Sequence, residues 1–157
     1  MQEHTEKDDA RKRYEFKKML EKMGDKEGGG TELISIYIPP DKQIHDVTAQ
    51  LRDEYGQCAN IKSKQTKTNV QSALSSILSR LKYYKNPPEN GMAVFCGAVY
   101  KGGDKSDMEC TIIEPPEPVN LYMYRCSSHF ELEPLQQMLG EKEVYGLVVI
   151  DRREAYI

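Results

Sequence analysis

Four consecutive residues, Asn60-Ile61-Lys62-Ser63 (the NIKS loop), carry side chains suited to contact with RNA. An asparagine amide offers donors and an acceptor to a base edge, a lysine ammonium attracts phosphate as a point charge, and a serine adds a hydroxyl. The loop lies in a window, residues 55–88, that contains six basic residues and no Asp or Glu. The whole chain has a formal charge of -3, so the remaining residues sum to -9. A concentrated positive face on an acidic protein predicts an anionic partner.

Lys64 and Lys67 follow the loop and are candidates for phosphate contacts. Tyrosine and phenylalanine rings elsewhere in the chain offer stacking surfaces worth about 1–3 kcal/mol per base. This mixture of groups is typical of single-stranded RNA recognition. The residue types alone leave two classes of function open: nucleic-acid binding, and a protein-interaction module that docks an acidic partner through the basic segment.

Enzymatic chemistry finds little support in the sequence. It contains neither a GxSxG nor an HExxH pattern. Ser127-Ser128-His129 places hydroxyls beside an imidazole, but sequence neighbours rarely form a base–nucleophile pair, so we expect a loop or a helix N-cap there. The four cysteines are widely spaced without a CxxC pair, which favours reduced thiols over a metal site. We therefore expect no catalysis, no metal and no cofactor.

Composition indicates a globular protein. The 157 residues allow one full domain, and 38% apolar with 30% charged content fits a packed core with a well-charged surface. No apolar run approaches the roughly 20 residues that span a bilayer. The polar N-terminus lacks the apolar stretch of a signal peptide. We expect a cytoplasmic protein that does not enter a membrane.

Helical periodicity flanks the NIKS loop on both sides. Apolar residues recur at helical spacing over 44–55 and, more regularly, over 70–81, with Thr66 or Thr68 as the expected N-cap of the second helix. Two helices joined by a short turn form an αα-hairpin, so the loop should be its protruding tip. Shorter helices are expected over 16–23 and 130–139.

Before residue 130, four segments are predicted to be strands: residues 33–38, 92–100, 108–113 and 121–126. Hairpins dominate and strands do not alternate regularly with helices, which predicts an α+β fold with a mostly antiparallel sheet packed with helices. Gly28-Gly29-Gly30 is expected to be a flexible connector. Gly30-Thr31-Glu32 (the Gly-Thr-Glu segment) is expected as a surface loop that presents polar side chains.

The expected domain organisation has three parts. Residues 1–13 form a flexible N-terminus, residues 14–141 form one domain, and residues 142–157 contain the first strand of a following, truncated domain. The strand over 144–151 is strongly apolar, and little sequence follows that could cover it.

Two motifs in order give the sequence a family resemblance. The NIKS loop, together with Tyr124-Arg125-Cys126-Ser127-Ser128-His129-Phe130 as a YxCxxxF pattern, resembles the N-terminal domain of archaeal and eukaryotic class I peptide chain release factors. The Gly-Thr-Glu segment lies where eukaryotic members carry Gly-Thr-Ser. The resemblance covers residues 14–151, and the composition is closer to archaeal members.

The resemblance implies a site that reads mRNA stop codons. Asn60 and Lys62, within the NIKS loop that also includes Ile61 and Ser63, would contact the first-position uridine. Glu54 and Tyr124 would help read the following purines, and Thr31, between Gly30 and Glu32, would face the codon. Cys126 and Phe130 would shape the pocket. Glu32 departs from the eukaryotic serine, but a carboxylate can accept a hydrogen bond from a purine amino group.

The resemblance also implies partners. The expected binding site is the decoding site of the small ribosomal subunit with its mRNA stop codon. In the full-length protein an elongation-factor-1-alpha-like GTPase is expected as a further partner. The GGQ tripeptide with which the family triggers peptidyl-tRNA hydrolysis is not in this sequence, so this chain should read a codon without catalysing release.

Overall fold

The computed structural model describes the backbone of residues 2–139 and the side chains of residues 7–139. Its elements in chain order are α1 (Gln2–Gly24), β1 (Gly28–Ile38), α2 (Ile44–Gln57), the 3-10 turn η1 (Cys58–Asn60), α3 (Lys64–Leu81), β2 (Met92–Gly102), β3 (Lys105–Ile113), β4 (Met123–Ser127) and α4 (Glu133–Gln137). The chain divides into two compact units. One unit is residues 26–131, and the described part of the other is residues 2–25 with 132–139.

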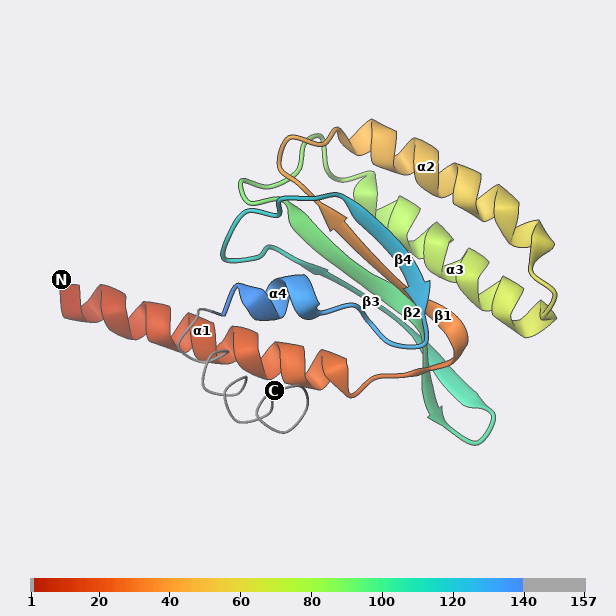
Figure 1. Ribbon diagram of the computed structural model, residues 1–157, viewed down its shortest axis with the longest axis horizontal. Coiled ribbons are helices and arrows are strands. Elements are labelled where there is room, and N and C mark those ends of the chain that lie inside the picture. Colours follow the sequence, from red (N-terminus) through yellow and green to blue (C-terminus); the bar gives the residue numbers. More distant parts are fainter. Residues whose placement is uncertain (1, 140–157) are drawn as a thin grey trace, which may run out of the picture. The chain divides into compact units, whose positions relative to one another are not determined.

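The larger unit is built on a four-stranded sheet in the order β3-β2-β1-β4, and every neighbouring pair is antiparallel (Figure 1). The apolar, β-branched runs in β1 and β2 place these two strands at the centre, where both sheet faces are buried. The α+β class and the antiparallel sheet expected from the sequence are confirmed.

Helices α2 and α3 pack side by side against one face of the sheet (Figure 1). Alternate residues of the central strands, such as Ile36 on β1 and Val94 on β2, meet the apolar faces of the two helices there. The α3 face buries Val70, Ala73, Leu74, Ile77 and Leu81, the residues whose spacing predicted the helix. The αα-hairpin is therefore confirmed, although α2 runs through Gly56, where the sequence indicated its end, to Gln57.

The start of β1 differs from the expected connector. The strand begins at Gly28 rather than Leu33, and its register with β2 breaks between these two residues. Gly28 lies opposite Val99 and Leu33 lies opposite Gly97, so the four residues 29–32 face a single residue of β2 and form a bulge. A Cβ on Gly97 would lie 2.6 Å from the backbone oxygen of Glu32, so only glycine lets the strands approach here.

The smaller unit contains α1 and α4, which contact each other. The sequence predicted a helix over 16–23, whereas α1 already begins at Gln2. Ion pairs along its polar side, such as Arg11 Nε with Glu15 Oε1 at 3.9 Å, are of the kind that support an exposed helix. Residues 2–13 are helical in backbone conformation, and their expected flexibility stays a prediction.

The C-terminal elements are shorter or shifted relative to the sequence expectation. Strand β4 spans Met123–Ser127 in place of 121–126, and α4 spans Glu133–Gln137 in place of 130–139. The expected strand within 142–157, and with it the boundary near residue 141, lies outside the described residues. Within the part of the chain that the structure describes, no helix combines the length and apolar character needed to cross a bilayer.

Candidate nucleic-acid interface

The tip of the α2–α3 hairpin is held by its own backbone and by two inward-facing side chains. The Cys58 thiol is buried and donates to the backbone oxygen of Glu54 at 3.2 Å, and the Ile61 amide donates to the Cys58 carbonyl at 3.0 Å. Ile61 packs partly buried against the core. The neighbouring Asn60 and Lys62 are exposed. The NIKS loop therefore presents Asn60 and Lys62 to solvent and uses Ile61 to fix its position.

Ser63 is the N-cap of α3. Its backbone is extended, and its side-chain oxygen accepts a hydrogen bond from the Thr66 amide at 3.2 Å. The expected cap at Thr66 or Thr68 is therefore wrong, because the helix starts at Lys64, a few residues earlier than the apolar periodicity indicated. The Ser63 hydroxyl, which the family resemblance assigned to the codon, already accepts a hydrogen bond that caps the start of α3.

The Gly-Thr-Glu segment lies in the β1 bulge and meets the start of α3. Glu32 is only 4% exposed, and its Oε2 accepts from Asn69 Nδ2 at 3.0 Å. A Cβ on Gly30 would lie 3.4 Å from the Thr66 hydroxyl, so the Gly30 backbone lies close to the Thr66 side chain. Thr31 is exposed. The expectation of a surface loop is corrected: the bulge turns Glu32 inward and leaves Thr31 outward.

Tyr124 and Cys126 lie on β4 and face the helices. They pair with Ile36 and Ile34 of β1, and both pack against the core beneath α2 and α3. The Tyr124 hydroxyl lies 3.6 Å from the Cys126 sulfur. Burial raises the pKa of both groups, and the negative charge of Glu54 adds to the effect. The charge of Glu54 on α2 thus acts electrostatically on Tyr124 of β4.

Phe130 lies on the other face of the sheet. Its ring packs edge to face on Phe95, with centroids 5.5 Å apart, and Phe95 alternates with residues that face the helices. The next amide, that of Glu131, donates to Ser35 Oγ at 2.8 Å on this same face. The structure therefore does not bring Phe130 together with Tyr124 and Cys126, and its buried position supports a packing role.

Tyr122 was missed by the sequence reasoning. It packs with Tyr124 against the same core, and burial, with the Glu54 charge, raises its pKa to about 12. Its hydroxyl is buried without a hydrogen-bond partner among the described residues, and Lys42 Nζ lies 4.8 Å from its ring centroid. The signal was its spacing: residues 122, 124 and 126 alternate as one side of an extended chain.

The cations near the loop are unpaired within the described residues. The ion pairs there include none formed by Lys62, Lys64 or Lys67. Lys62 and Lys64 are exposed, and Lys67 is partly buried close to the Cys58 thiol, whose pKa is raised by burial and Glu54 and lowered by this lysine. These charges remain available to an anionic ligand.

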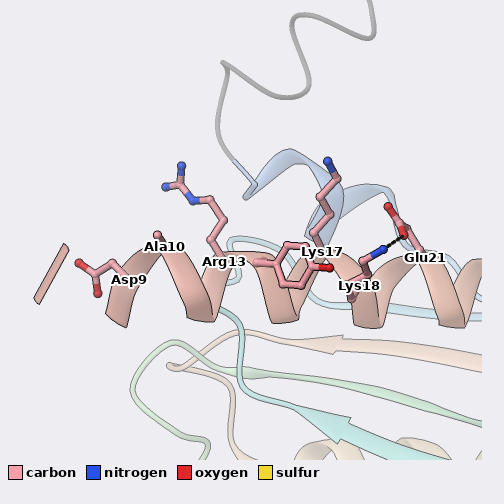
Figure 2. Close-up of a pocket in the computed structure, with 7 residues that line it drawn as sticks. Asp9, Ala10, Arg13, Lys17, Lys18 and Glu21 are labelled. Atoms are coloured by element: carbon pink, nitrogen blue, oxygen red, sulfur yellow. Dashed lines mark ion pairs between the residues drawn. The ribbon is translucent and has the colours of Figure 1, made fainter. Parts of the chain in front are cut away.

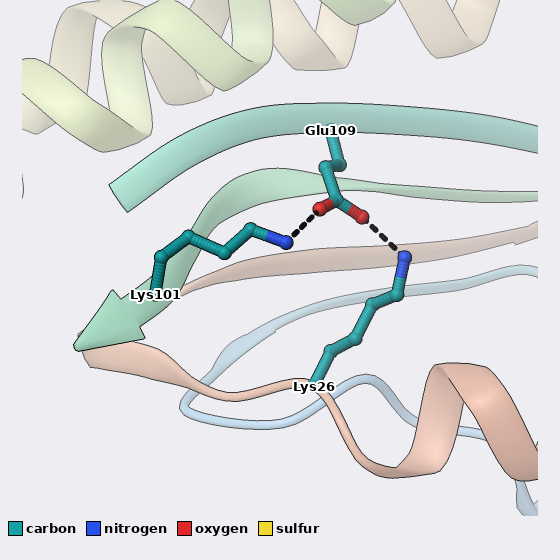
Figure 3. A network of polar contacts seen from close by, with 3 residues as sticks. All are labelled: Lys26, Lys101 and Glu109. Carbon is teal, nitrogen blue, oxygen red and sulfur yellow. Dashed lines mark hydrogen bonds and ion pairs between the residues drawn. The ribbon is translucent and has the colours of Figure 1, made fainter. Parts of the chain in front are cut away.

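Two lysines outside the loop, Lys26 before β1 and Lys101 on β2, are paired. Lys26 and Lys101 both bind the carboxylate of Glu109, Lys101 at 2.7 Å (Figure 3). The pKa of Glu109 is lowered by the hydrogen bond from Lys101 and then by that from Lys26. The positive charges of Lys26 and Lys101 are thus partly neutralised by Glu109.

A chain of polar contacts joins Ser128, His129 and Glu27. Ser128 Oγ lies 3.1 Å from His129 Nδ1, and His129 Nε2 lies 3.3 Å from Glu27 Oε1. The order is that of a nucleophile, a base and a carboxylate, but the histidine and glutamate side chains are more than half exposed. An imidazole in water lacks the tuned environment of a general base. The Gly28 amide also donates a hydrogen bond to the Ser128 carbonyl, at 2.8 Å. Together these contacts connect the end of β4 to β1.

A hollow of about 550 Å³ follows one side of α1 (Figure 2). Its lining residues all belong to this helix: Asp9, Ala10, Arg13, Tyr14, Lys17, Lys18 and Glu21. Charges of both signs line it, and Lys18 is paired with Glu21 at 3.7 Å. None of the residues expected to bind RNA lies in it. Among the described residues, no cluster of three or more His, Cys, Asp or Glu side chains could hold a metal ion.

The sequence matches a model of the family described as eRF1 domain 1 over residues 11–140. The peptide chain release factor subunit 1 of Methanosarcina mazei is 60% identical over 94% of this chain and 36% of its own length, and that of Thermoplasma acidophilum is 57% identical over 97% of this chain and 36% of its own. A solved structure of an archaeal translation termination factor, aRF1, has a TM-score of 0.74 and 34% identity over 82% of this chain and 35% of that one. The chain thus spans about a third of the length of these relatives.

Proposed function

Because the chain belongs to the eRF1 domain 1 family, we propose that it recognises mRNA stop codons in the decoding site of the small ribosomal subunit during translation termination. The observation that supports the proposal is that parts of three separate sequence motifs lie against the α2–α3 hairpin. The start of α3 contacts the β1 bulge through Asn69 and Glu32, and Ile61 and Tyr124 pack against the same hydrophobic core.

In this proposal, different side chains read different parts of the codon. Asn60 and Lys62 protrude from a loop whose position is fixed by Ile61, so they are free to contact the first base. The carboxylate of Glu54 accepts from purine amino groups, and Tyr124 offers a ring edge and a hydroxyl beside it. Thr31 presents a hydroxyl from the bulge. Lys64 and Lys67 hold phosphates near the loop.

Other residues of the predicted site support the codon-reading residues by capping, hydrogen bonding or packing. Ser63 caps α3, Glu32 binds Asn69, Gly30 allows the bulge to approach Thr66, and Cys126 packs beneath Tyr124. Phe130 stabilises the opposite sheet face. We assign the third codon position to Thr31 and Glu54 rather than to Glu32, because Glu32 is buried.

The remaining steps of termination belong to the full-length protein. This sequence carries no GGQ, so we assign peptidyl-tRNA hydrolysis to a domain outside it and no catalytic activity to this chain. An elongation-factor-1-alpha-like GTPase is the proposed partner of the full-length protein, and the cytoplasm is the proposed compartment.

The test compares Lys62→Ala with Lys105→Ala in the full-length protein. Lys105 is an exposed lysine at the β2–β3 turn, outside the proposed site. Binding is measured to small ribosomal subunits programmed with a stop codon or a sense codon. We expect Lys62→Ala to reduce the stop-over-sense preference about tenfold, because a good base contact contributes on the order of 1–3 kcal/mol of discrimination. Lys105→Ala should leave the preference unchanged.

An unchanged stop-over-sense preference in Lys62→Ala contradicts the assignment of the loop. A protein-interaction module would show a different pattern, in which both programmed subunits bind equally before and after the substitution.

A further inference from the structure

We propose that the outer face of α3 is a second RNA-binding surface, which holds a sugar-phosphate backbone of ribosomal RNA independently of the codon. The inference rests on the proposed function, since it takes the decoding site as the place where the domain docks. This face is formed by exposed or partly exposed residues: Thr68, Ser72, Ser75, Ser76, Ser79 and, just past the helix, Tyr83. Arg80 lies at its edge, where its guanidinium is also near Cys110 of β3.

Helical geometry places these residues on one side. Thr68, Ser72 and Ser76 follow one another at a spacing of four, and Ser75, Ser79 and Tyr83 form a parallel row with the same spacing. The apolar residues that the helix buries lie on the opposite side. The face therefore presents a continuous band of hydroxyl groups to solvent.

The charged residues of this segment have one sign. Arg80, Lys82 and Lys85 are exposed at its far end, and Lys64 is exposed at its start. The sequence places no Asp or Glu between residues 55 and 88, although the rest of the chain is acidic. By contrast, Lys26 and Lys101 are neutralised by Glu109 (Figure 3). A helix face that only needed solubility would gain from alternating charges, so the absence of carboxylates favours a polyanionic ligand.

The far end of the face is hollowed. Ser75, Ser76, Ser79, Arg80 and Tyr83 line a space of about 400 Å³. The Tyr83 side chain is 90% exposed, which is unusual for a large aromatic ring and leaves it free to stack on a base or a ribose. Hydroxyls, a guanidinium and an exposed ring are the groups that contact RNA backbones.

We favour RNA over an acidic protein as the ligand for two reasons: the side chains of the face are short, and the face continues from the NIKS loop. Serines are short, so a phosphate can approach the helix closely and accept hydrogen bonds from several hydroxyls. Serine also has a lower helix propensity than alanine, lysine or glutamate, so a band of serines on an exposed face weakens the helix without a packing benefit. The band begins beside the NIKS loop and extends ~24 Å along the helix from Lys64 to Arg80, at 1.5 Å per residue. One RNA-facing surface thus continues from the codon site.

The test uses the double variant Ser75→Glu/Ser79→Glu in the full-length protein. Both residues are exposed, and glutamate is a good helix former, so the fold is kept. The matched control is Lys105→Glu, which changes the net charge by the same amount away from α3. Binding is measured to small ribosomal subunits programmed with a stop or a sense codon, over a range of salt concentrations.

We expect the double variant to bind both kinds of subunit about tenfold more weakly, with an unchanged stop-over-sense ratio. The salt slope should fall by about one for each phosphate that the variant no longer binds. Binding of the double variant within about twofold of the Lys105→Glu control overturns the inference, because non-specific charge then explains the whole effect. The result is separable from the Lys62→Ala test, which changes the codon ratio and not the binding common to both subunits.

Crosslinking identifies the partner on this face. With Tyr83→p-benzoylphenylalanine in the full-length protein, irradiation on the programmed subunit should join position 83 to ribosomal RNA. Crosslinks confined to ribosomal protein contradict the proposal and identify an acidic protein surface as the occupant.

Discussion

Asn69 and Glu32, 37 residues apart in the chain, are joined by a hydrogen bond of 3.0 Å between the amide nitrogen and a carboxylate oxygen. Glu32 is almost fully buried, and Asn69 comes from the second turn of α3. This bond fixes the β1 bulge against the helix that follows the NIKS loop. The segment that contains Thr31 is therefore held against the helix that follows the loop containing Lys62.

Replacing Asn69 by leucine should destabilise the fold by about 1–3 kcal/mol, because one oxygen of a buried carboxylate loses its donor. The free energy of unfolding from urea denaturation at neutral pH measures the effect. Gln65→Ala is the control, since its side chain only makes an exposed hydrogen bond of 3.3 Å to Asn69 and should cost less than about 0.5 kcal/mol. Equal stability of the two variants contradicts the connection.

Ser63→Ala should cost about 0.5–2 kcal/mol, the usual loss when an N-cap is removed. Ser63→Asn should restore most of the stability, because an asparagine oxygen also accepts from the Thr66 amide. The asparagine variant should keep the stop-over-sense preference in ribosome binding. If it is stable but loses that preference, the hydroxyl contacts the codon directly and its role is more than capping.

Variants of Phe130 test whether this residue of the YxCxxxF motif packs the domain or reads the codon. Phe130→Leu keeps most of the buried volume and should cost less than about 1.5 kcal/mol, while Phe130→Ala should cost about 3–5 kcal/mol. Because the ring faces Phe95 and not Tyr124, the stable leucine variant should read stop codons normally. A selective loss of codon preference in this variant is the outcome that would restore Phe130 to the site.

The sequence predicted the elements whose pattern is local. The spacing of apolar residues from Val70 to Leu81 predicts an amphipathic helix. The apolar run from Leu33 to Ile38 predicts a buried strand. The hairpin and its protruding loop follow from these elements and a short connection. Helix ends were harder: α3 begins at Lys64 because Ser63 caps it, and no apolar residue marks that turn.

Features that depend on distant partners were not predictable. A glutamate in a glycine-rich stretch reads as exposed, and only its pairing with Asn69 makes burial tolerable. The side of the sheet on which Phe130 lies depends on the turn after β4, which no periodicity specifies. The spacing of Tyr122 and Tyr124 predicts that they share one side of the chain. The effect of the Glu54 charge on Tyr122 depends on how α2 packs on the sheet, which the sequence does not show.

The Glu109 network predicts a pH effect on stability. Hydrogen bonds from Lys101 and Lys26 lower the pKa of this carboxyl in the folded state. A lowered folded pKa stabilises the fold above the unfolded pKa, about 4.3 for glutamate, and the contribution is lost as pH falls through the folded pKa. Glu109→Gln should lose about 1 kcal/mol at pH 7 and show a flatter fall in stability between about pH 5 and pH 3. Parallel curves for the two proteins would contradict the network.

Cys110 should be the most readily alkylated thiol of the described chain. It lies directly opposite Cys96 across β2 and β3 and is partly exposed. The neighbouring Cys96 and the nearby Arg80 guanidinium lower the pKa of Cys110, whereas the pKa of Cys58, Cys96 and Cys126 is raised. Since the thiolate is the reactive form, iodoacetamide near pH 7.5 should modify Cys110 first, as followed by peptide mass spectrometry.

Arg80→Gln tests the electrostatic part of that order. It removes the positive charge beside Cys110 while keeping a polar side chain of similar reach, so alkylation of Cys110 should slow while Cys126, whose pKa does not depend on Arg80, keeps its rate. Because Cys126 is also partly exposed, it reports any general loosening of the fold. Equal slowing at both thiols, or faster reaction at Cys126 than at Cys110 in the unmodified protein, would show that access and not charge sets the reactivity.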